Sequence, residues 1–300
     1  MAARMELDRA EEVLLETPGT VLLLGGIDTG KTTFGVQLLA KARERGIPAA
    51  IVDADVGQST VGPPTTIGLR LASSLDEISR ESLRPADALS FVGSITPAGH
   101  VVSLVTGTAK LVRRARDAGC RLVIVDTTGH VAGIHGQMLK YFKMDSVVPD
   151  FVVAFERGGE LEPIVGIARR FTSAEVLEIE VPLDVVPRSV EERMTFRERQ
   201  FAAYFSSGTS RWRVRPTVFM PTPPPEFDFA VLDKLVVGME DGTGTCVGIG
   251  VLEYEGSEDI LRMVSPVTEG VKGLRLGSVR IETSGRSLGP VDLRDLFRTE

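Results

Sequence analysis

The sequence predicts an α/β fold in which a doubly wound, mostly parallel sheet is followed by a small C-terminal antiparallel β-domain. Two observations indicate the first part. Short apolar runs of strand length alternate with segments of helical periodicity over roughly the first 180 residues. Several of these runs lack polar alternation, as strands buried on both faces do. A third observation, short alternating segments separated by glycines after residue 205, indicates the antiparallel part.

The expected elements of the first part follow one another in a regular order. A short amphipathic lead-in helix over 1–17 ends at Pro18 and Gly19, and an apolar strand follows at 20–24. A helix after residue 30 is closed by Gly46 and Pro48. Further strands are expected at 49–52, 66–69, 89–92, 122–125, 151–155 and 176–181, and a helix at 104–118. We assign 18–208 to one domain, with its site at the carboxyl ends of the parallel strands.

The character of the chain changes towards the C-terminus. Pro216 and the proline-rich run 221–225 indicate a stiff connector or an edge segment. Short alternating segments then recur at 235–237, 246–249, 260–264, 274–276 and 279–281. Residues 209–300 are therefore predicted to form the small antiparallel β-domain or a barrel.

Composition limits the classes of protein to consider. The chain has 300 residues, of which 43% are hydrophobic and 25% charged, as in soluble globular proteins. No apolar run approaches the ~20 residues of a membrane span, and the acidic N-terminal stretch does not resemble a signal peptide. Two distant cysteines suit a reducing cytoplasm. We expect a cytoplasmic protein without a membrane partner; since its net charge is −7, any polyanion site must be a local basic patch.

The stretch between the first strand and its helix fits the P-loop pattern G-x-x-x-x-G-K-[ST]. It reads Gly25, Gly26, Ile27, Asp28, Thr29, Gly30, Lys31 and Thr32, with Thr33 next. Backbone N–H groups of such a loop surround nucleotide phosphates at a helix N-terminus, where the helix dipole favours anions. Lys31 is placed to reach the β- and γ-phosphates, and the Thr32 hydroxyl to bind Mg²⁺. The sequence therefore predicts a P-loop NTPase type of domain that binds a nucleoside triphosphate.

Aspartates follow two further strands of the predicted sheet. Asp126 ends the strand at 122–125, as the Walker B acid that helps to hold Mg²⁺ does; a helix cap or loop aspartate is the alternative. Asp53 and Asp55 end the strand at 49–52 beside the P-loop helix. A carboxylate there can orient and deprotonate an attacking hydroxyl or bind Mg²⁺, whereas two turn aspartates before Gly57 are the alternative.

Two missing features narrow the reaction. No Asn-Lys-x-Asp follows the strand at 151–155, which runs instead into Glu156 and Arg157. The guanine-reading motif of GTPases is thus absent, which favours ATP or relaxed use of bases. Gly26 stands where the deviant-Walker ATPases carry lysine, which argues against that class.

An arginine-rich segment follows the predicted parallel strands. Residues 188–215 contain seven arginines and three glutamates in an otherwise acidic chain. Ser189 and Glu192 have the spacing of a capping box, so a helix is expected to begin there. Arg193 and Arg197 share one face of it, with Arg188 just before the cap. The segment 188–205, which we call the lid, brings arginine onto a transferring phosphate; a solvated charged helix is the alternative.

Together these motifs resemble the P-loop polynucleotide 5′-hydroxyl kinases related to RNA 3′-end-processing and pre-rRNA-processing factors. The matching motifs are the P-loop with its internal aspartate, Asp53-x-Asp55-x-Gly57-Gln58, Asp126-Thr127-Thr128-Gly129, and the lid running into Phe201-x-x-Tyr204-Phe205. The resemblance implies transfer of the γ-phosphate of ATP to the 5′-OH of RNA or DNA, with Mg²⁺.

The resemblance also assigns roles to residues. It implies that Asp55 is the catalytic aspartate and that Arg193 and Arg197 act with Lys31 on the phosphate. We expect Thr32, Asp53 and Asp126 to hold the metal. Residues expected to contact the polynucleotide are Asp55, Gln58, Thr127, Thr128, Gly129, His130 and Arg188. An exposed loop histidine is the alternative for His130.

Two other functions compete with this reading. A nucleotide-binding RNA-processing scaffold would bind ATP without turning it over. The intact set of Lys31, Thr32, Asp55 and the arginines argues against it, because a scaffold needs no base. A P-loop GTPase switch is opposed by the missing guanine motif.

Overall fold

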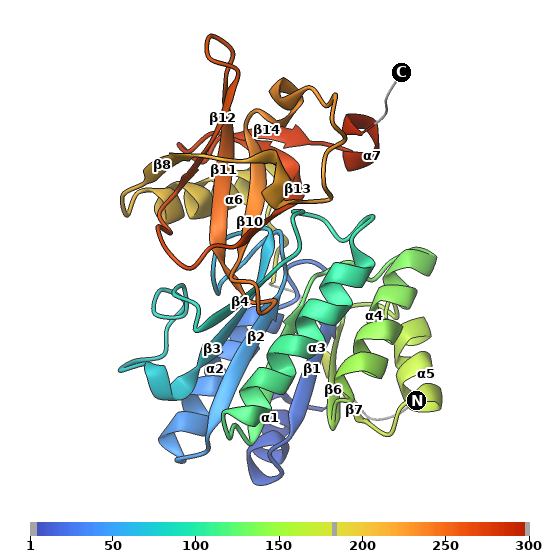
Figure 1. Cartoon of the computed structure of the whole chain (residues 1–300). Coiled ribbons are helices and arrows are strands. Elements are labelled where there is room, and N and C mark those ends of the chain that lie inside the picture. The colour runs from blue at the N-terminus through green and yellow to red at the C-terminus, as the bar shows by residue number, and fades with distance from the viewer. Residues whose placement is uncertain (1–4, 182–184, 298–300) are drawn as a thin grey trace.

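One mixed sheet runs through the whole molecule (Figure 1). The computed structural model describes residues 5–181 and 185–297. Five parallel strands form one half, in the order β2 (Ala49–Ala54), β5 (Leu122–Thr127), β1 (Thr20–Gly25), β6 (Phe151–Glu156) and β7 (Glu175–Glu180). Beside β2, the strands β3 (Thr66–Leu71) and β4 (Ala88–Phe91) run antiparallel. The prediction of a doubly wound, mostly parallel sheet is confirmed.

Helices cover both faces of the parallel strands, as Figure 1 shows. One face packs against α1 (Leu7–Glu16) and α2 (Lys31–Glu44). The other packs against α3 (Val101–Asp117), α4 (Gly133–Val147) and α5 (Glu162–Phe171). Leu22 and Leu24 of β1 point into one core and Val21 and Leu23 into the other. This explains why the strand sequences lack polar alternation. The sequence had not located α4 and α5 individually.

The C-terminal strands are mainly antiparallel, as the sequence predicted. They are β8 (Ser210–Arg213), β9 (Phe219–Met220), β10 (Leu235–Glu240), β11 (Cys246–Glu255), β12 (Ile260–Ser265), β13 (Gly273–Ile281) and β14 (Ser287–Pro290), before α7 (Leu293–Leu296). The segments expected at 274–276 and 279–281 are one strand, β13. Cys246 of β11 pairs with Leu89 of β4, so these strands continue the central sheet. The position of the domain boundary at residue 208 stays a prediction.

The lid helix α6 (Val190–Phe205) joins the two halves of the molecule. Its predicted capping box is confirmed, because the Ser189 hydroxyl accepts from the Glu192 N–H and the Glu192 carboxylate from the Ser189 N–H. At its other end Phe201 and Phe205 are buried among residues of β4, β10, β11 and β13. The C-terminal strands therefore fix the distal end of α6, and its arginine-bearing end lies over the P-loop.

Within 5–181 and 185–297, none of the helices combines the length and the apolar character that crossing a bilayer requires.

Candidate active site

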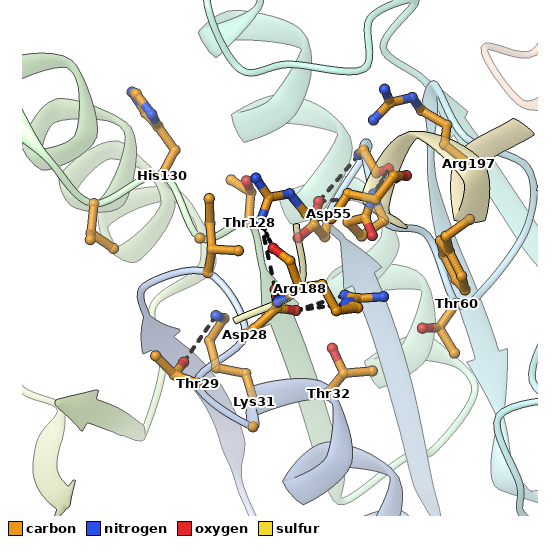
Figure 2. A pocket seen from close by; sticks show the side chains of 18 of the residues that line it. Asp28, Thr29, Lys31, Thr32, Asp55, Thr60, Thr128, His130, Arg188 and Arg197 are labelled. Atoms are coloured by element: carbon orange, nitrogen blue, oxygen red, sulfur yellow. Dashed lines mark hydrogen bonds and ion pairs between the residues drawn. The ribbon is translucent and has the colours of Figure 1, made fainter. Parts of the chain in front are cut away.

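A cavity of about 720 Å³ opens where the carboxyl ends of β1, β2 and β5 meet the lid. Figure 2 shows many of the side chains around it. It is lined by P-loop residues 27–33, the loop after β2, residues 95–97, residues 128–132 and the lid with the residues before it. The P-loop, the loop after β2 and the lid, which are far apart in the sequence, therefore meet at one site, at the edge of the sheet expected for this fold.

The P-loop has the backbone that its pattern requires. Gly30 has a φ of 91° immediately before α2 begins at Lys31. A Cβ at Gly25 would lie 2.5 Å from the Thr29 hydroxyl, so this position has no room for a side chain. The Lys31 ammonium donates to the Gly26 carbonyl at 2.5 Å and lies 3.3 Å from the Thr29 hydroxyl. Burial lowers the pKa of Lys31. The Gly26 carbonyl and the Thr29 hydroxyl thus bind the ammonium that would otherwise bind phosphate oxygens.

Thr32 and Asp126 form an oxygen pair at the start of α2. The Thr32 hydroxyl donates to Asp126 Oδ2 at 2.5 Å. The other oxygen, Asp126 Oδ1, is buried and has no hydrogen-bond partner among the described residues. Burial raises the pKa of Asp126, because the charged carboxylate loses its hydration there. An orphaned carboxylate oxygen beside a hydroxyl is a donor set that suits Mg²⁺.

Asp53 and Asp55 have different surroundings, although they end the same strand. Asp53 is 2% exposed, and its carboxylate accepts from the backbone N–H groups of Asp55, Thr60 and Val61. Burial, followed by the charge of neighbouring Asp126, raises the pKa of Asp53 to about 8. Asp55 is half-buried, lines the cavity and accepts at Oδ1 from the N–H groups of Gly57 and Gln58, both at 3.2 Å. Asp53 therefore shapes the loop that presents Asp55.

Residues 127–130, at the carboxyl end of β5, divide into a buried part and a part that faces the cavity. Thr127 is buried and donates to the Leu23 carbonyl at 2.7 Å, so its side chain does not reach the cavity. Thr128, Gly129 and His130 do line it. A Cβ at Gly129 would lie 2.7 Å from the Ile27 nitrogen, so this segment lies directly against the P-loop. Partial burial lowers the pKa of His130. Figure 2 shows His130 and Arg197 on opposite sides of the P-loop residues.

Two fully buried lysines of α4 lie behind this segment. Lys140 donates to the Thr127 hydroxyl at 2.9 Å and to the Thr128 carbonyl. The Lys143 ammonium has no hydrogen-bond partner among the described residues. Burial lowers the pKa of both, that of Lys143 to about 8. Lys140 therefore fixes the loop from inside the molecule.

The substitution Lys140→Met is expected to lower the free energy of unfolding by about 1–3 kcal/mol, because the Thr127 hydroxyl and the Thr128 carbonyl lose a buried partner. Urea denaturation measures the change. Lys143→Met is the matched control, since it removes an equally buried ammonium that makes no such bonds. Equal losses in the two variants would show that Lys140 does not hold the loop.

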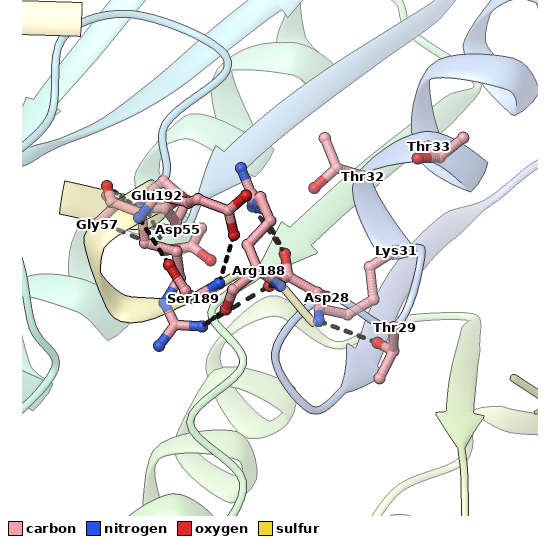
Figure 3. Close-up of polar contacts among 12 residues, drawn as sticks. Asp28, Thr29, Lys31, Thr32, Thr33, Asp55, Gly57, Arg188, Ser189 and Glu192 are labelled. Carbon is pink, nitrogen blue, oxygen red and sulfur yellow. Dashed lines mark hydrogen bonds and ion pairs between the residues drawn. The ribbon is translucent and has the colours of Figure 1, made fainter. Parts of the chain in front are cut away.

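The predicted arginines of the lid all line the cavity. Arg188 binds the carboxylate of Asp28, as Figure 3 shows. Arg193 donates to the Arg188 carbonyl at 2.6 Å, and the Gln58 side chain donates to the Arg193 carbonyl at 3.1 Å. Arg197 is different, because its buried Nε has no partner in the described part of the chain. Burial lowers the pKa of Arg197.

Three basic residues at this site had not been singled out from the sequence. Arg80 lines the cavity and donates to the Thr33 hydroxyl at 2.6 Å. Arg157 donates to the carbonyls of Asp28 at 2.8 Å and Val185 at 3.0 Å. Arg80 lies in a long polar loop without a pattern that indicates binding. Arg157 follows β6 and Lys140 lies in α4, so their place at the site depends on how these elements pack.

A P-loop at the edge of a parallel sheet, with an oxygen pair for a metal and arginines above it, defines a P-loop nucleotide-binding protein. Residues 25–207 match the family model described as the mRNA cleavage and polyadenylation factor CLP1 P-loop, and the chain belongs to this family.

Curated relatives agree with this assignment. A polyribonucleotide 5′-hydroxyl-kinase of Pyrococcus horikoshii is 30% identical, over 93% of this chain and 90% of the relative. The corresponding enzyme of Pyrococcus furiosus is 31% identical, over 93% and 92%. A chain in the structure of a wild-type Clp1p–Pcf11p complex superposes with a TM-score of 0.72 at 13% identity, covering 91% of this chain and 78% of that one. The last likeness concerns the fold alone. The resemblance to polynucleotide 5′-hydroxyl kinases is confirmed.

Proposed function

We propose that this protein is an ATP- and Mg²⁺-dependent polynucleotide 5′-hydroxyl kinase, which transfers the γ-phosphate of ATP to the 5′-OH end of RNA or DNA. One observation carries the proposal: Asp55 lines the same cavity as the P-loop and the lid arginines. A proton acceptor, a phosphate-binding loop and positive charge thus converge on one space. The names of the relatives, which are polyribonucleotide 5′-hydroxyl-kinases, support the same activity.

The nucleotide would be held by the P-loop. Its backbone N–H groups from Gly25 to Thr33 and the Lys31 ammonium bind the phosphates, in exchange for the contacts that Lys31 makes with the loop. Thr32 and Asp126 would hold Mg²⁺, with Asp53 beside Asp126 on the next strand. When bound, the ion neutralises charge on the β- and γ-phosphates.

The acceptor side of the reaction falls to Asp55. The 5′-oxygen forms a bond to the γ-phosphorus, the bond from that phosphorus to the β–γ bridging oxygen breaks, and ADP leaves. Asp55 orients the 5′-OH and takes its proton. Lid arginines offset the charge on the transferred group. Gln58, Thr128, Gly129 and His130 line the cavity and would contact the polynucleotide, whereas Thr127 supports them from behind. Arg188, which the sequence places among these contacts, also lines the cavity and would act with the lid arginines.

Transfer of labelled phosphate from γ-labelled ATP to an oligonucleotide tests this function directly. A 5′-OH oligonucleotide and the same oligonucleotide carrying a 5′-phosphate are each incubated with the protein and Mg²⁺. Label should appear on the first and not on the second. Hydrolysis of ATP that is unaffected by either oligonucleotide would instead favour a binding scaffold or an NTPase switch.

Base discrimination should be weak, with ATP used at least as well as GTP. Arg157 stands where a guanine-reading motif would begin. Its guanidinium donates hydrogen bonds to the carbonyls of Asp28 and Val185. Competition between labelled ATP and unlabelled GTP, with 5′-phosphate formation as the readout, measures the preference. A strong preference for GTP would contradict the assignment and would favour the alternative, a P-loop GTPase switch.

A further inference from the structure

Asp28, at the tip of the P-loop, holds the arginine that precedes the lid helix. Its Oδ1 accepts from Arg188 Nε at 3.0 Å and Nη2 at 2.7 Å, and its Oδ2 accepts from the Arg188 backbone N–H at 2.9 Å. The Asp28 side chain is 13% exposed. Its φ of 52° lies in the left-handed region, which aspartate tolerates better than most residues. Both carboxylate oxygens are therefore turned to the lid.

Further contacts surround this pair, and one of them, between Arg193 and Asp28, also joins the lid to the P-loop. The Arg188 guanidinium lies over the Phe196 ring, 5.4 Å from its centroid. Arg193 donates to the Arg188 carbonyl at 2.6 Å, and its Nη1 lies 3.8 Å from Asp28 Oδ2. Arg157 donates to the backbone carbonyl of Asp28 at 2.8 Å. Figure 3 shows the Asp28–Arg188 contact beside the lid cap formed by Ser189 and Glu192.

Asp28 is a negatively charged residue in a loop that binds negatively charged phosphates. An uncompensated carboxylate on a phosphate-binding loop repels a triphosphate, so its side chain is a poor nucleotide ligand. The Arg188 guanidinium compensates this charge, and the carboxylate in turn holds the guanidinium by one edge. Arg188 Nη1 makes no hydrogen bond within the described part of the chain, and Arg188 lines the cavity. A guanidinium held by one edge and one face is preorganised to bind phosphate oxygens.

We propose that Asp28 is a positioning residue, which docks the start of the lid on the P-loop and aims Arg188, with Arg193 behind it, at the transferred phosphoryl group. This inference rests on the proposed kinase activity and gives the P-loop aspartate a task separate from nucleotide binding. It predicts that Asp28 and Arg188 act through each other.

The kinetic test uses D28N, R188Q and the double variant in single-turnover phosphorylation of a 5′-OH oligonucleotide. Asparagine keeps the size of the side chain and tolerates the left-handed backbone, but it removes the charge. Each single change should lower turnover by about 10- to 100-fold through misplacement of the lid, with KM for ATP little changed. The double variant should be no slower than the slower single variant, because both remove one interaction.

Limited trypsin digestion without nucleotide gives a second readout, independent of activity. Trypsin cleaves after the lid arginines, so D28N should be cut there faster than wild type. D87N is the matched control: Asp87 accepts from Arg70 Nη1 at 3.0 Å and the Leu71 N–H at 2.7 Å, so its carboxylate likewise binds an arginine and a backbone N–H, but on β3. It should leave both the lid cleavage and the turnover unchanged.

Three results would overturn the proposal. If the effects of D28N and R188Q multiply in the double variant, or if D28N raises KM for ATP while turnover holds, Asp28 acts on the nucleotide itself. If D28N is cut no faster than wild type, Asp28 does not dock the lid. A failure of the proposed kinase activity is distinguishable from these results, because the wild-type protein would then transfer no phosphate. The digestion would still compare the rate of lid cleavage in D28N and wild type.

Discussion

Arg197→Ala should reduce the single-turnover rate of phosphoryl transfer by about 10³-fold, the scale found when an arginine that meets the transferred phosphoryl group is removed. Arg193 already donates a hydrogen bond to the Arg188 carbonyl, whereas the buried Nε of Arg197 has no hydrogen-bond partner among the described residues. We therefore expect Arg197 to show the larger loss of the two and Arg188 a smaller one. The loss should fall on turnover, with ATP affinity changed less, because the charge acts on the transition state in a desolvated site.

Arg199→Ala is the control for this prediction. Arg199 lies on the same helix but is exposed and does not line the cavity, so its loss should cost ~0–1 kcal/mol in stability and leave the rate near wild type. Arg197→Lys should rescue poorly, because an ammonium lacks the planar fork that spans two phosphate oxygens. If Arg193→Ala and Arg197→Ala both fold and retain wild-type rates, the lid is only a charged helix.

Asp55→Asn should reduce turnover by about 10²-fold or more, the usual scale for loss of a general base. ATP should still bind, because Asp55 makes its hydrogen bonds to loop N–H groups away from the P-loop. Rates with saturating ATP and binding of a fluorescent ATP analogue separate the two effects.

Asp53→Asn is the matched comparison for Asp55. Asp53 is buried with both oxygens bonded to loop N–H groups, so its substitution should act mainly on stability. Melting temperatures are measured alongside. A larger loss of turnover in Asp53→Asn than in Asp55→Asn would show that the base has been assigned to the wrong carboxylate.

Local patterns in the sequence were sufficient for the features that depend on neighbouring residues. The P-loop needs a fixed spacing of glycines and Lys31 between a strand and a helix, and the cap of α6 needs Ser189 three residues before Glu192. Both can be read from short stretches. The buried strands were equally visible, because burial on both faces removes polar alternation.

Features that depend on distant segments were not predictable in this way. Nothing near Asp28 indicates that it binds Arg188, because 160 residues separate them. The continuation of the sheet from β4 to β11 rests on one pair, Leu89 with Cys246, which no periodicity reveals. The packing of Phe201 against the C-terminal strands likewise follows from the path of the chain in space. These contacts explain how the C-terminal strands position the lid.

The central claim is that the phosphate leaves ATP only to enter a 5′-OH end. ADP release and new 5′-phosphate are measured in one reaction, by coupled assay and by mass spectrometry of the oligonucleotide, with and without a 5′-OH acceptor. The account predicts one 5′-phosphate for each ADP and little ADP without acceptor. ADP formed at the same rate in both reactions, with no gain in oligonucleotide mass, would contradict it.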